Sequence, residues 1–229
     1  MCGRFAIKST PDYLRRLLGF VERPNFPPRY NIAPMQPIPL VRVENGARHF
    51  ILARWGLIPS WVKDPRQFAL LINARAEGIA EKPSFRAAIR RRRCLVPADG
   101  FYEWRREGKS KRPYFIRARG GEPMAFAGIW ETWIGADGGE IDTAAIITCA
   151  ANAVLQPIHA RMPVVIPSEA FDRWLDPDET KFKEACVLLK PAPDDFMEAY
   201  EVSPRVNKAA HDDAENIVPV ASAADIKAA

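Results

Sequence analysis

The sequence lacks any apolar run long enough to span a membrane, and its start lacks the basic-then-apolar pattern of a secretory signal. We therefore expect a cytoplasmic protein with no membrane partner. Regular β-α-β alternation and a Gly-rich phosphate loop are also missing, which disfavours a nucleotide-binding α/β fold. No repeat or low-complexity linker divides the 229 residues, so we expect one domain over residues 1–229, with a loose tail from about residue 210.

Cysteine and histidine are too few and too scattered to suggest a metal centre. The four cysteines form no C-x-x-C pair, which argues against a zinc site and against a disulfide framework. Only three histidines are present. We therefore expect neither a metal nor another cofactor. The cysteines are Cys2, Cys94, Cys149 and Cys186, and the histidines are His49, His159 and His211.

Charge is divided unevenly along the chain. Residues 1–119 hold 25 Lys and Arg against 9 Asp and Glu, whereas the remaining residues hold 8 against 19. This asymmetry favours one basic face that meets a polyanion. The run of four arginines at residues 90–93 supports that interpretation, because guanidinium groups match phosphate geometry. The alternative is that the two halves neutralise each other across the fold.

Strand-like segments cluster in the middle of the chain. Proline, at 21 of 229 residues, has about twice its usual share and predicts short strands joined by rigid loops. The pattern predicts an α+β domain with a curled, mostly antiparallel, barrel-like sheet and a few flanking helices. We expect strands within residues 38–43, 49–59, 94–104, 112–118, 125–131, 143–151, 162–167 and 199–207. We expect helices at Pro11–Leu18, within residues 82–92, and at about Ser168–Leu175 and Asp178–Cys186, with a short helix or turn in residues 151–161.

The opening sequence MCGRF places a cysteine directly behind the initiator methionine. Initiator methionines ahead of small residues are normally removed, so we expect the mature chain to begin at Cys2. A terminal cysteine carries an α-amine with a pKa of about 7.7–8.0 and a thiol with a pKa of about 8.5 on adjacent carbons. The amine can condense with an aldehyde to an iminium, and the thiol can then close a five-membered thiazolidine. The alternative is that Met1 is retained and Cys2 is an ordinary internal cysteine.

Three other segments carry polar residues suited to chemistry. In LINARAE, Asn73 can donate to a carbonyl or sugar oxygen and Arg75 can hold a phosphate, although a satisfied turn is the alternative. In PADGFYEW, we expect a turn at Asp99-Gly100 that leads into a strand. Glu103 lies between two aromatic residues of that strand, and its desolvation there would suit acid–base work unless it faces solvent. In IHARMPVVI, His159 could transfer protons and Arg161 could hold a phosphate, unless His159 is structural.

Together these segments resemble the SRAP family, the SOS response-associated peptidases or abasic-site processing proteins. The matching motifs run in order through nearly the whole chain: MCGRF, YNIAP, WGLIPSW, INARAE, CLVPADGFYEW, FAGIWE, IITCAAN, IHARMPVVI and VSPRVN. The resemblance implies the SRAP fold and a protein that captures abasic sites in single-stranded DNA covalently, shielding them from strand cleavage. It further implies Schiff-base, lyase-type chemistry, DNA near single-strand to duplex junctions as the partner, and association with the nucleoid on DNA damage.

The resemblance also assigns roles to particular residues. Cys2 corresponds to the crosslinking nucleophile, Asn73 to the residue that orients the linkage, Glu103 to the acid that assists ring opening and proton transfer, and His159 to an acid and base around the Schiff base. An autopeptidase activity would release Met1, although an aminopeptidase could do so instead. The residues implied to contact DNA are Arg4, Arg75, Arg161 and Trp61, with Lys82 or Arg86 as a further basic contact.

Two other function classes stay open from the residues alone. Glutamine amidotransferases of the N-terminal-nucleophile type also begin Cys-Gly and attack an amide with the thiol. Such enzymes usually pass ammonia to an attached synthetase domain, for which this chain has no room. A non-catalytic protein that binds single-stranded DNA or a modified base would use the same basic surface reversibly. The sequence has no heptad pattern and no long apolar edge, which predicts a monomer.

Overall fold

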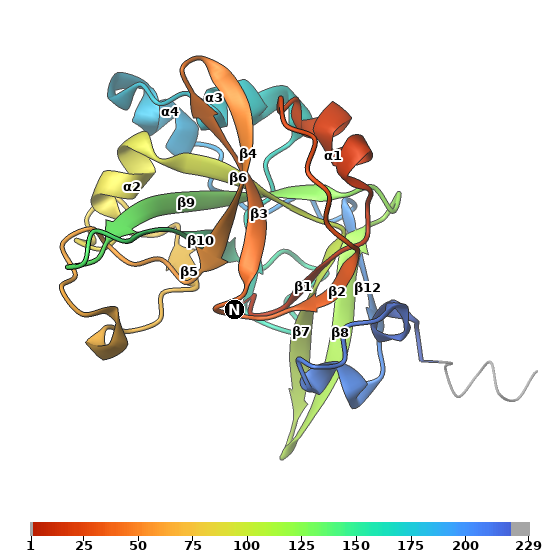
Figure 1. The fold of residues 1–229 in the computed structure, drawn as a ribbon. Coiled ribbons are helices and arrows are strands. Elements are labelled where there is room, and N and C mark those ends of the chain that lie inside the picture. Colours follow the sequence, from red (N-terminus) through yellow and green to blue (C-terminus); the bar gives the residue numbers. More distant parts are fainter. Residues whose placement is uncertain (1, 221–229) are drawn as a thin grey trace, which may run out of the picture.

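The structure is a computed structural model that describes residues 2–220, and it contains two β-sheets (Figure 1). The first sheet consists of β1 (Phe5–Ile7), β2 (Arg29–Ile32), β7 (Gly100–Glu107), β8 (Ser110–Ala118) and β12 (Met197–Glu201). Its strand order is β12-β8-β7-β1-β2, and every neighbouring pair is antiparallel. The strand that follows Cys2 therefore lies inside this sheet and not at its edge.

The second sheet closes on itself. It consists of β3 (Pro37–Glu44), β4 (Ala47–Trp55), β5 (Asn73–Arg75), β6 (Arg93–Ala98), β9 (Met124–Ile134), β10 (Glu140–Ala150) and β11 (Arg161–Pro163). The order β10-β4-β3-β6-β9 is completed by a further pairing of β9 with β10, so these five strands form a closed barrel, which leaves them no open edges. Only the pairings of β10 with β4 and with β5 are parallel. The predicted α+β domain with a curled, mostly antiparallel, barrel-like sheet is confirmed.

Four short helices flank the sheets: α1 (Pro11–Leu18), α2 (Arg86–Arg91), α3 (Phe171–Leu175) and α4 (Phe182–Cys186). The predicted helix α1 is confirmed. It begins after Thr10, whose side chain accepts a hydrogen bond from the Tyr13 N–H, and it ends at Gly19, which takes the left-handed conformation with φ of 72°. Helix α2 lies within the predicted residues 82–92, and α3 and α4 each follow a 3-10 turn, Ser168–Ala170 and Glu179–Lys181, so the predicted helical segments are confirmed nearly in full. Among the described residues, no helix is long and apolar enough to cross a membrane.

The two sheets share one core at the N-terminal strand. Phe5 on β1 is fully buried, and its ring centroid lies 5.1 Å from that of Trp55 on β4 and 6.3 Å from that of Phe126 on β9. Phe101 on β7 also packs on Phe126, at 5.8 Å. Edge-to-face contacts of this kind hold the rings at fixed relative positions. Because Phe5 belongs to one sheet and packs on the other, the segment that starts at Cys2 is fixed between them.

Residues 94–104 form β6 and β7, which belong to different sheets and meet at the predicted turn at Asp99-Gly100. The chain changes sheet at Asp99, whose buried carboxylate accepts hydrogen bonds of 2.7 and 2.9 Å from two backbone N–H groups that follow β1. At the next residue, Gly100, an added Cβ would lie 2.2 Å from the ring of Phe115. Only glycine allows this close approach of the backbone.

Of the other predicted segments, one is less regular than expected: the strand predicted over residues 199–207 ends early, and Pro204–Asn207 forms a 3-10 turn. Residues 151–161 contain turns, one of the two predicted alternatives. In residues 162–167, the chain passes from β10 to β9: the Val164 N–H donates to the Ile147 carbonyl on β10 at 2.9 Å, and the Ile166 N–H donates to the Ala125 carbonyl on β9 at 2.9 Å.

The C-terminal segment is folded further than predicted. Residues Ala214–Ile217 form a 3-10 turn, and the Asp212 carboxylate accepts a hydrogen bond of 2.9 Å from the Asn31 N–H on β2. Asp212 also forms an ion pair with Arg29. The expectation of a loose tail from residue 210 is therefore wrong up to residue 220, and residues 221–229 lie outside the described residues.

Candidate active site

The structure brings the four predicted catalytic residues together. Asn73 on β5 donates a hydrogen bond from Nδ2 to the Cys2 carbonyl oxygen at 2.8 Å. Glu103 on β7 is buried close enough to Cys2 for its charge to act on the thiol. His159, in the turn before β11, has Nδ1 3.9 Å from Oε1 of Glu103. Cys2 and three residues that are distant from it in the sequence therefore lie in one cluster.

The Cys2 thiol is kept in its protonated form. Cys2 is fully buried, and burial raises the pKa of its thiol well above the usual range. The nearby negative charge of Glu103 raises this pKa further. A thiol held in this way keeps its proton until a base receives it.

The position of Asn73 is set by the barrel core. The indole Nε1 of Trp55 donates to the carbonyl oxygen of Ile72 at 2.9 Å, directly before Asn73. Strand β5 also pairs with β10 through the register of Asn73 with Ile146. The Asn73 Oδ1 atom is buried and has no hydrogen-bond partner within residues 2–220. A buried amide oxygen without a partner is costly, so it marks a place where a ligand donor can bind.

The imidazole of His159 has a defined orientation. The backbone N–H of Arg161 donates to Nδ1 of His159 at 3.0 Å. Because a backbone N–H is always a donor, Nδ1 accepts this hydrogen bond. Nδ1 also lies 3.2 Å from the Arg161 carbonyl oxygen, so both backbone groups of Arg161 contact the same ring nitrogen.

Arg161 is bound to protein groups and does not present a free guanidinium. It makes a bidentate ion pair with Glu77, with N to O distances of 2.7 and 2.8 Å, and donates to the Thr148 carbonyl at 2.6 Å. The hydrogen bond from Arg161 lowers the pKa of Glu77 below its usual value. These contacts fix the backbone next to His159. The sequence predicts a DNA contact for Arg161 instead.

Arg4 is also engaged internally. Its guanidinium donates to Asn31 Oδ1 at 2.7 Å and to the carbonyl oxygens of Val206 and Asn207 at 2.8 and 3.2 Å. Burial lowers the pKa of Arg4. The guanidinium thus joins the N-terminal strand to the 3-10 turn that precedes the C-terminal segment.

The other residues predicted to contact DNA are exposed. Arg75, Lys82 and Arg86 make no ion pair with any of residues 2–220. Trp61 is 57% exposed on the loop after β4, and its ring packs edge-to-face on Phe68 at 5.5 Å. These side chains are open to a ligand, in contrast to Arg4 and Arg161.

The arginine run at residues 90–93 does not form the predicted phosphate-binding patch, because all four side chains have partners within the protein. Arg90 lies over an aromatic ring, two others form ion pairs, and Arg93 is buried and bound to carbonyl oxygens. Their partners, in order, are Phe182, Glu179, Glu131, and the carbonyl oxygens of Ile89, Arg90 and Trp174.

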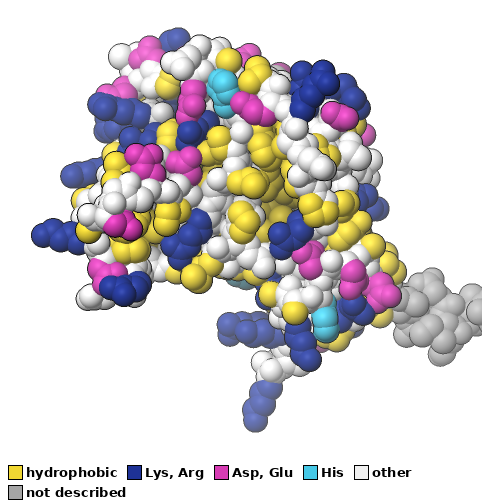
Figure 2. Space-filling view, in the orientation of Figure 1, with side chains coloured by type: hydrophobic (Ala, Val, Ile, Leu, Met, Phe, Trp, Pro, Cys, Tyr) yellow, Lys and Arg dark blue, Asp and Glu magenta, His cyan; other side chains and the backbone are white. Residues whose placement is uncertain are grey.

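The basic and acidic halves of the chain are partly paired with each other. Basic and acidic side chains lie side by side over the body of the molecule in Figure 2. The ion pairs between the halves are Arg29–Asp212, Arg42–Asp142, Arg48–Asp172, Arg91–Glu179, Arg92–Glu131, Arg112–Glu201 and Arg117–Glu198. Among the described residues, these pairs engage seven of the 25 basic residues of the first half, so mutual neutralisation accounts for part of the asymmetry. Exposed cations such as Arg75, Lys82 and Arg106 are left for a polyanion.

Sequence reasoning missed a pocket of about 390 Å³ beside the catalytic cluster. Glu103 and His159 line it, together with Trp104, Arg106, Lys111 and Asn207. The alternation of residues 104 and 106 on one face of β7 is the one signal that could have indicated it. Within residues 2–220, no group of three His, Cys, Asp or Glu side chains could hold a metal ion.

Comparison with known proteins places this arrangement in a family. The chain is 41% identical over 212 residues to the abasic site processing protein YoqW of Bacillus subtilis, covering 90% of this chain and 94% of that one. It is 32% identical over 264 residues to the abasic site processing protein HMCES of Gallus gallus, covering 96% and 78%. A crystal structure of a protein from Bacteroides thetaiotaomicron superposes with a TM-score of 0.84 at 28% identity, covering 96% of this chain and all of that one. The SOS response associated peptidase (SRAP) family matches residues 1–209, and the chain belongs to this family.

Proposed function

We propose that this protein processes abasic sites in DNA, and that it captures them in single strands through a covalent thiazolidine at Cys2 once Met1 has been removed. The observation that carries the proposal is the convergence of Asn73, Glu103 and His159 on Cys2. Family membership and the names of the relatives support an abasic site as the substrate.

The proposed reaction joins the N-terminal aminothiol to the ring-opened sugar. The α-amine of Cys2 adds to the aldehyde carbon, and water leaves to give an iminium. The thiol sulfur then adds to the same carbon, and the S–H proton passes to a base. The product contains all atoms of protein and DNA except one water, and it has no C=N bond.

The surrounding residues suit these proton transfers. The buried Glu103 carboxylate acts on the Cys2 thiol and is the group proposed to receive its proton. His159 is proposed to protonate the hydroxyl group that leaves as water, because its ring lies beside Glu103, with Nδ1 3.9 Å from Oε1. Asn73 holds the Cys2 carbonyl, and its Oδ1 is the proposed acceptor for the Cys2 amine.

Ring closure explains how the lesion is protected. An open aldehyde or iminium acidifies the neighbouring C–H of the sugar and promotes elimination of the phosphate, which cuts the strand. A thiazolidine carbon is saturated and gives no such activation. A reaction that stopped at the iminium would lead to cleavage of the DNA strand, as in a lyase. Addition of the Cys2 thiol removes the C=N bond and so protects the strand.

A single strand fits the location of the site. Cys2 has no exposed surface, so the sugar must bend in to reach it. A single strand bends readily, and an abasic site has no base to unpair or unstack. We propose single-stranded DNA, including that beside a duplex junction, as the substrate.

The test uses a single-stranded oligonucleotide with one abasic site, analysed on a denaturing gel. A shifted band that is absent with Cys2→Ala supports the proposal. No shifted band from the unmodified protein contradicts it. Reversible binding alone that survives Cys2→Ala indicates a non-catalytic binding protein, and ammonia release from glutamine indicates an amidotransferase.

The removal of Met1 is tested separately by intact mass. If the protein cleaves itself, Glu103→Gln made in the same host should retain Met1 while the unmodified protein loses it. If both lose Met1, an aminopeptidase is responsible. A variant with one extra residue fixed ahead of Cys2 should form no stable adduct.

A further inference from the structure

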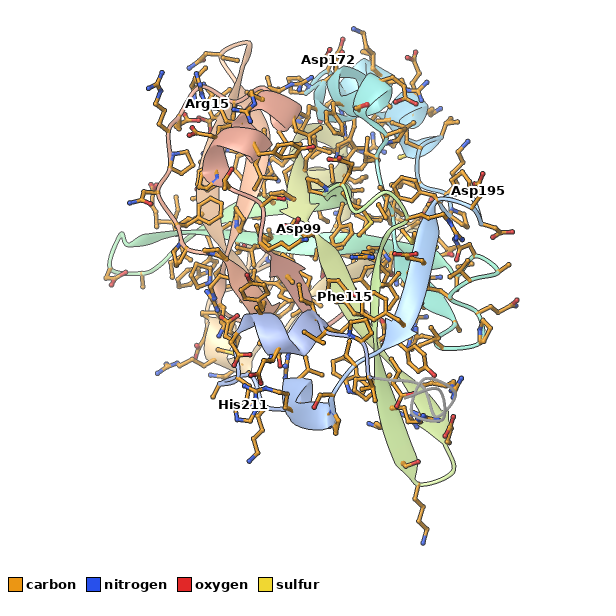
Figure 3. The ribbon with its side chains drawn as sticks, turned by 90° about the vertical axis from the view of Figure 1, so that its right-hand side faces the viewer. Arg15, Asp99, Phe115, Asp172, Asp195 and His211 are labelled. Carbon is orange, nitrogen blue, oxygen red and sulfur yellow. The ribbon has the colours of Figure 1, made fainter. Side chains whose placement is uncertain are left out.

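The β7–β8 hairpin extends beyond the body of the molecule and carries basic side chains (Figures 1 and 2). Figure 3 shows the same extension from the side. Arg106 on β7 lies directly opposite Lys111 on β8 in the antiparallel register. Both side chains are exposed, and both line the pocket that contains Glu103 and His159.

These two cations lack a counter-charge. Neither Arg106 nor Lys111 makes an ion pair or side-chain hydrogen bond with any of residues 2–220. By contrast, Arg112 in the same hairpin forms ion pairs with Glu107 and Glu201. Like charges directly opposite each other on a sheet are destabilising. An anion placed between Arg106 and Lys111 would relieve this repulsion.

Asn207 adds a neutral donor to the same pocket. Its Oδ1 accepts a hydrogen bond of 2.7 Å from the indole Nε1 of Trp104, which leaves Nδ2 as the donor presented elsewhere. The Asn207 carbonyl is held by Arg4 at 3.2 Å, so the backbone at this position is fixed from the other side. The pocket wall thus combines two cations and one positioned amide.

We propose that Arg106, Lys111 and Asn207 form a subsite for a backbone phosphate of the DNA that flanks the abasic nucleotide. All three offer donors, and a phosphodiester offers only acceptors and a negative charge. Strands rise about 3.3 Å per residue, so Arg106 lies about 10 Å along β7 from Glu103. This subsite rests on the proposed function, because it takes the strand whose abasic sugar is bound at Cys2.

The test measures reversible DNA binding, with Cys2→Ala as the background so that no stable covalent bond forms. Fluorescence anisotropy is recorded with a labelled single-stranded oligonucleotide carrying an abasic site, over a series of salt concentrations. Arg106→Ala/Lys111→Ala should bind about tenfold more weakly, with the log–log salt slope smaller by about 0.7 for each phosphate that the variant no longer neutralises. The matched control is Lys183→Ala/Lys190→Ala, which removes the same charge from exposed positions outside this pocket.

Asn207→Asp separates a phosphate contact from a folding effect. Its carboxylate oxygen can still accept from the Trp104 indole, but its negative charge repels phosphate. It should weaken binding while the circular dichroism spectrum and unfolding midpoint stay those of the background protein. The oligonucleotide is also shortened from one end or from the other. Only one of the two shortenings should abolish the difference in affinity between the double variant and the background protein, because the subsite binds one flank.

Two results would overturn the subsite. In the first, Arg106→Ala/Lys111→Ala binds DNA as tightly as the Lys183/Lys190 control does. In the second, its loss of affinity stays the same when the DNA is shortened on either side of the abasic site. The proposed function is judged apart from this, by crosslinking of the unmodified protein. If no crosslink forms but binding depends on Arg106 and Lys111, the covalent proposal fails and the phosphate site stands. If crosslinks form and Arg106→Ala/Lys111→Ala binds as the control does, the covalent proposal stands and the phosphate subsite fails.

Discussion

The side-chain amide of Asn73 donates a hydrogen bond to the backbone carbonyl of Cys2 at 2.8 Å. Trp55 holds the preceding carbonyl, of Ile72, at 2.9 Å, so this contact is anchored in the barrel core. The hydrogen bond places Cys2 without using its amine or its thiol. Under the proposed function, the amine released with Met1 and the thiol can therefore both react with an aldehyde.

Replacing Asn73 with Ala should slow crosslinking at saturating DNA about 10- to 100-fold, because small displacements of a reacting group reduce the rate steeply. Single-turnover gel assays with an abasic oligonucleotide measure the rate. Asn25→Ala, at an exposed position, is the control and should react as the unmodified protein does. An Asn73→Ala rate equal to that of this control would remove Asn73 from the reaction.

Glu103→Gln keeps the shape of the side chain and removes its charge. Crosslinking should slow about 10²- to 10⁴-fold, the usual range for loss of a positioned acid or base. The pKa of the Cys2 thiol should also fall, because the Glu103 charge raises it, while burial still holds it above the ordinary value. Rates of adduct formation and the pH dependence of thiol alkylation provide the two measurements. An unchanged rate with a lowered pKa would make Glu103 an electrostatic neighbour only.

The ion pair of Glu77 with Arg161 predicts a pH-dependent contribution to stability. The pKa of Glu77 is lowered in the folded state by the hydrogen bond from Arg161. Its stabilisation is therefore present above the unfolded-state pKa of about 4.3 and is lost as the pH falls through the lower folded value. Urea unfolding should show Glu77→Gln less stable than the unmodified protein at pH 7, by less than about 1 kcal/mol because the carboxylate is largely exposed. The difference should vanish at low pH, and a difference that grows there would contradict this assignment.

Trp55→Phe should couple stability to reactivity. It removes the hydrogen bond to Ile72 and part of the ring that packs on Phe5, which should lower the free energy of unfolding by about 1–3 kcal/mol. Because Ile72 precedes Asn73, crosslinking should slow as well, even where the variant is fully folded. Phe126→Leu disturbs the same core without touching Ile72 and is the matched control. Equal crosslinking rates in the two variants would show that Trp55 contributes through packing alone.

The sequence predicts the barrel from local physical signals and the candidate catalytic cluster from the family resemblance. Apolar, β-rich segments and turn residues are local signals, and they indicated the curled sheet and α1 correctly. The convergence of Cys2, Asn73, Glu103 and His159 followed from family motifs, because distances between residues so far apart in sequence leave no local pattern.

Pairing partners were the part that sequence could not predict. Arg161 is bound to Glu77 and Arg4 to the backbone near Asn207, so both have structural contacts where DNA contacts were expected. The run at residues 90–93 was misinterpreted for the same reason, since a guanidinium suits a carboxylate or carbonyl as well as a phosphate. The turn at Asp99-Gly100 was predicted, but the change of sheet there was not, because its cause is a set of hydrogen bonds to a distant segment.

The most direct test of the central claim is the intact mass of the adduct between the unmodified protein and an abasic oligonucleotide, with and without borohydride. A thiazolidine through Cys2 predicts a stable adduct without borohydride, with the mass of the protein lacking Met1 plus the DNA minus one water. Borohydride should leave that mass unchanged, because no C=N bond remains, and Cys2→Ala should give an adduct only when borohydride is present. An unmodified protein that is trapped only by borohydride, or a Cys2→Ala adduct equally stable without it, would contradict the account.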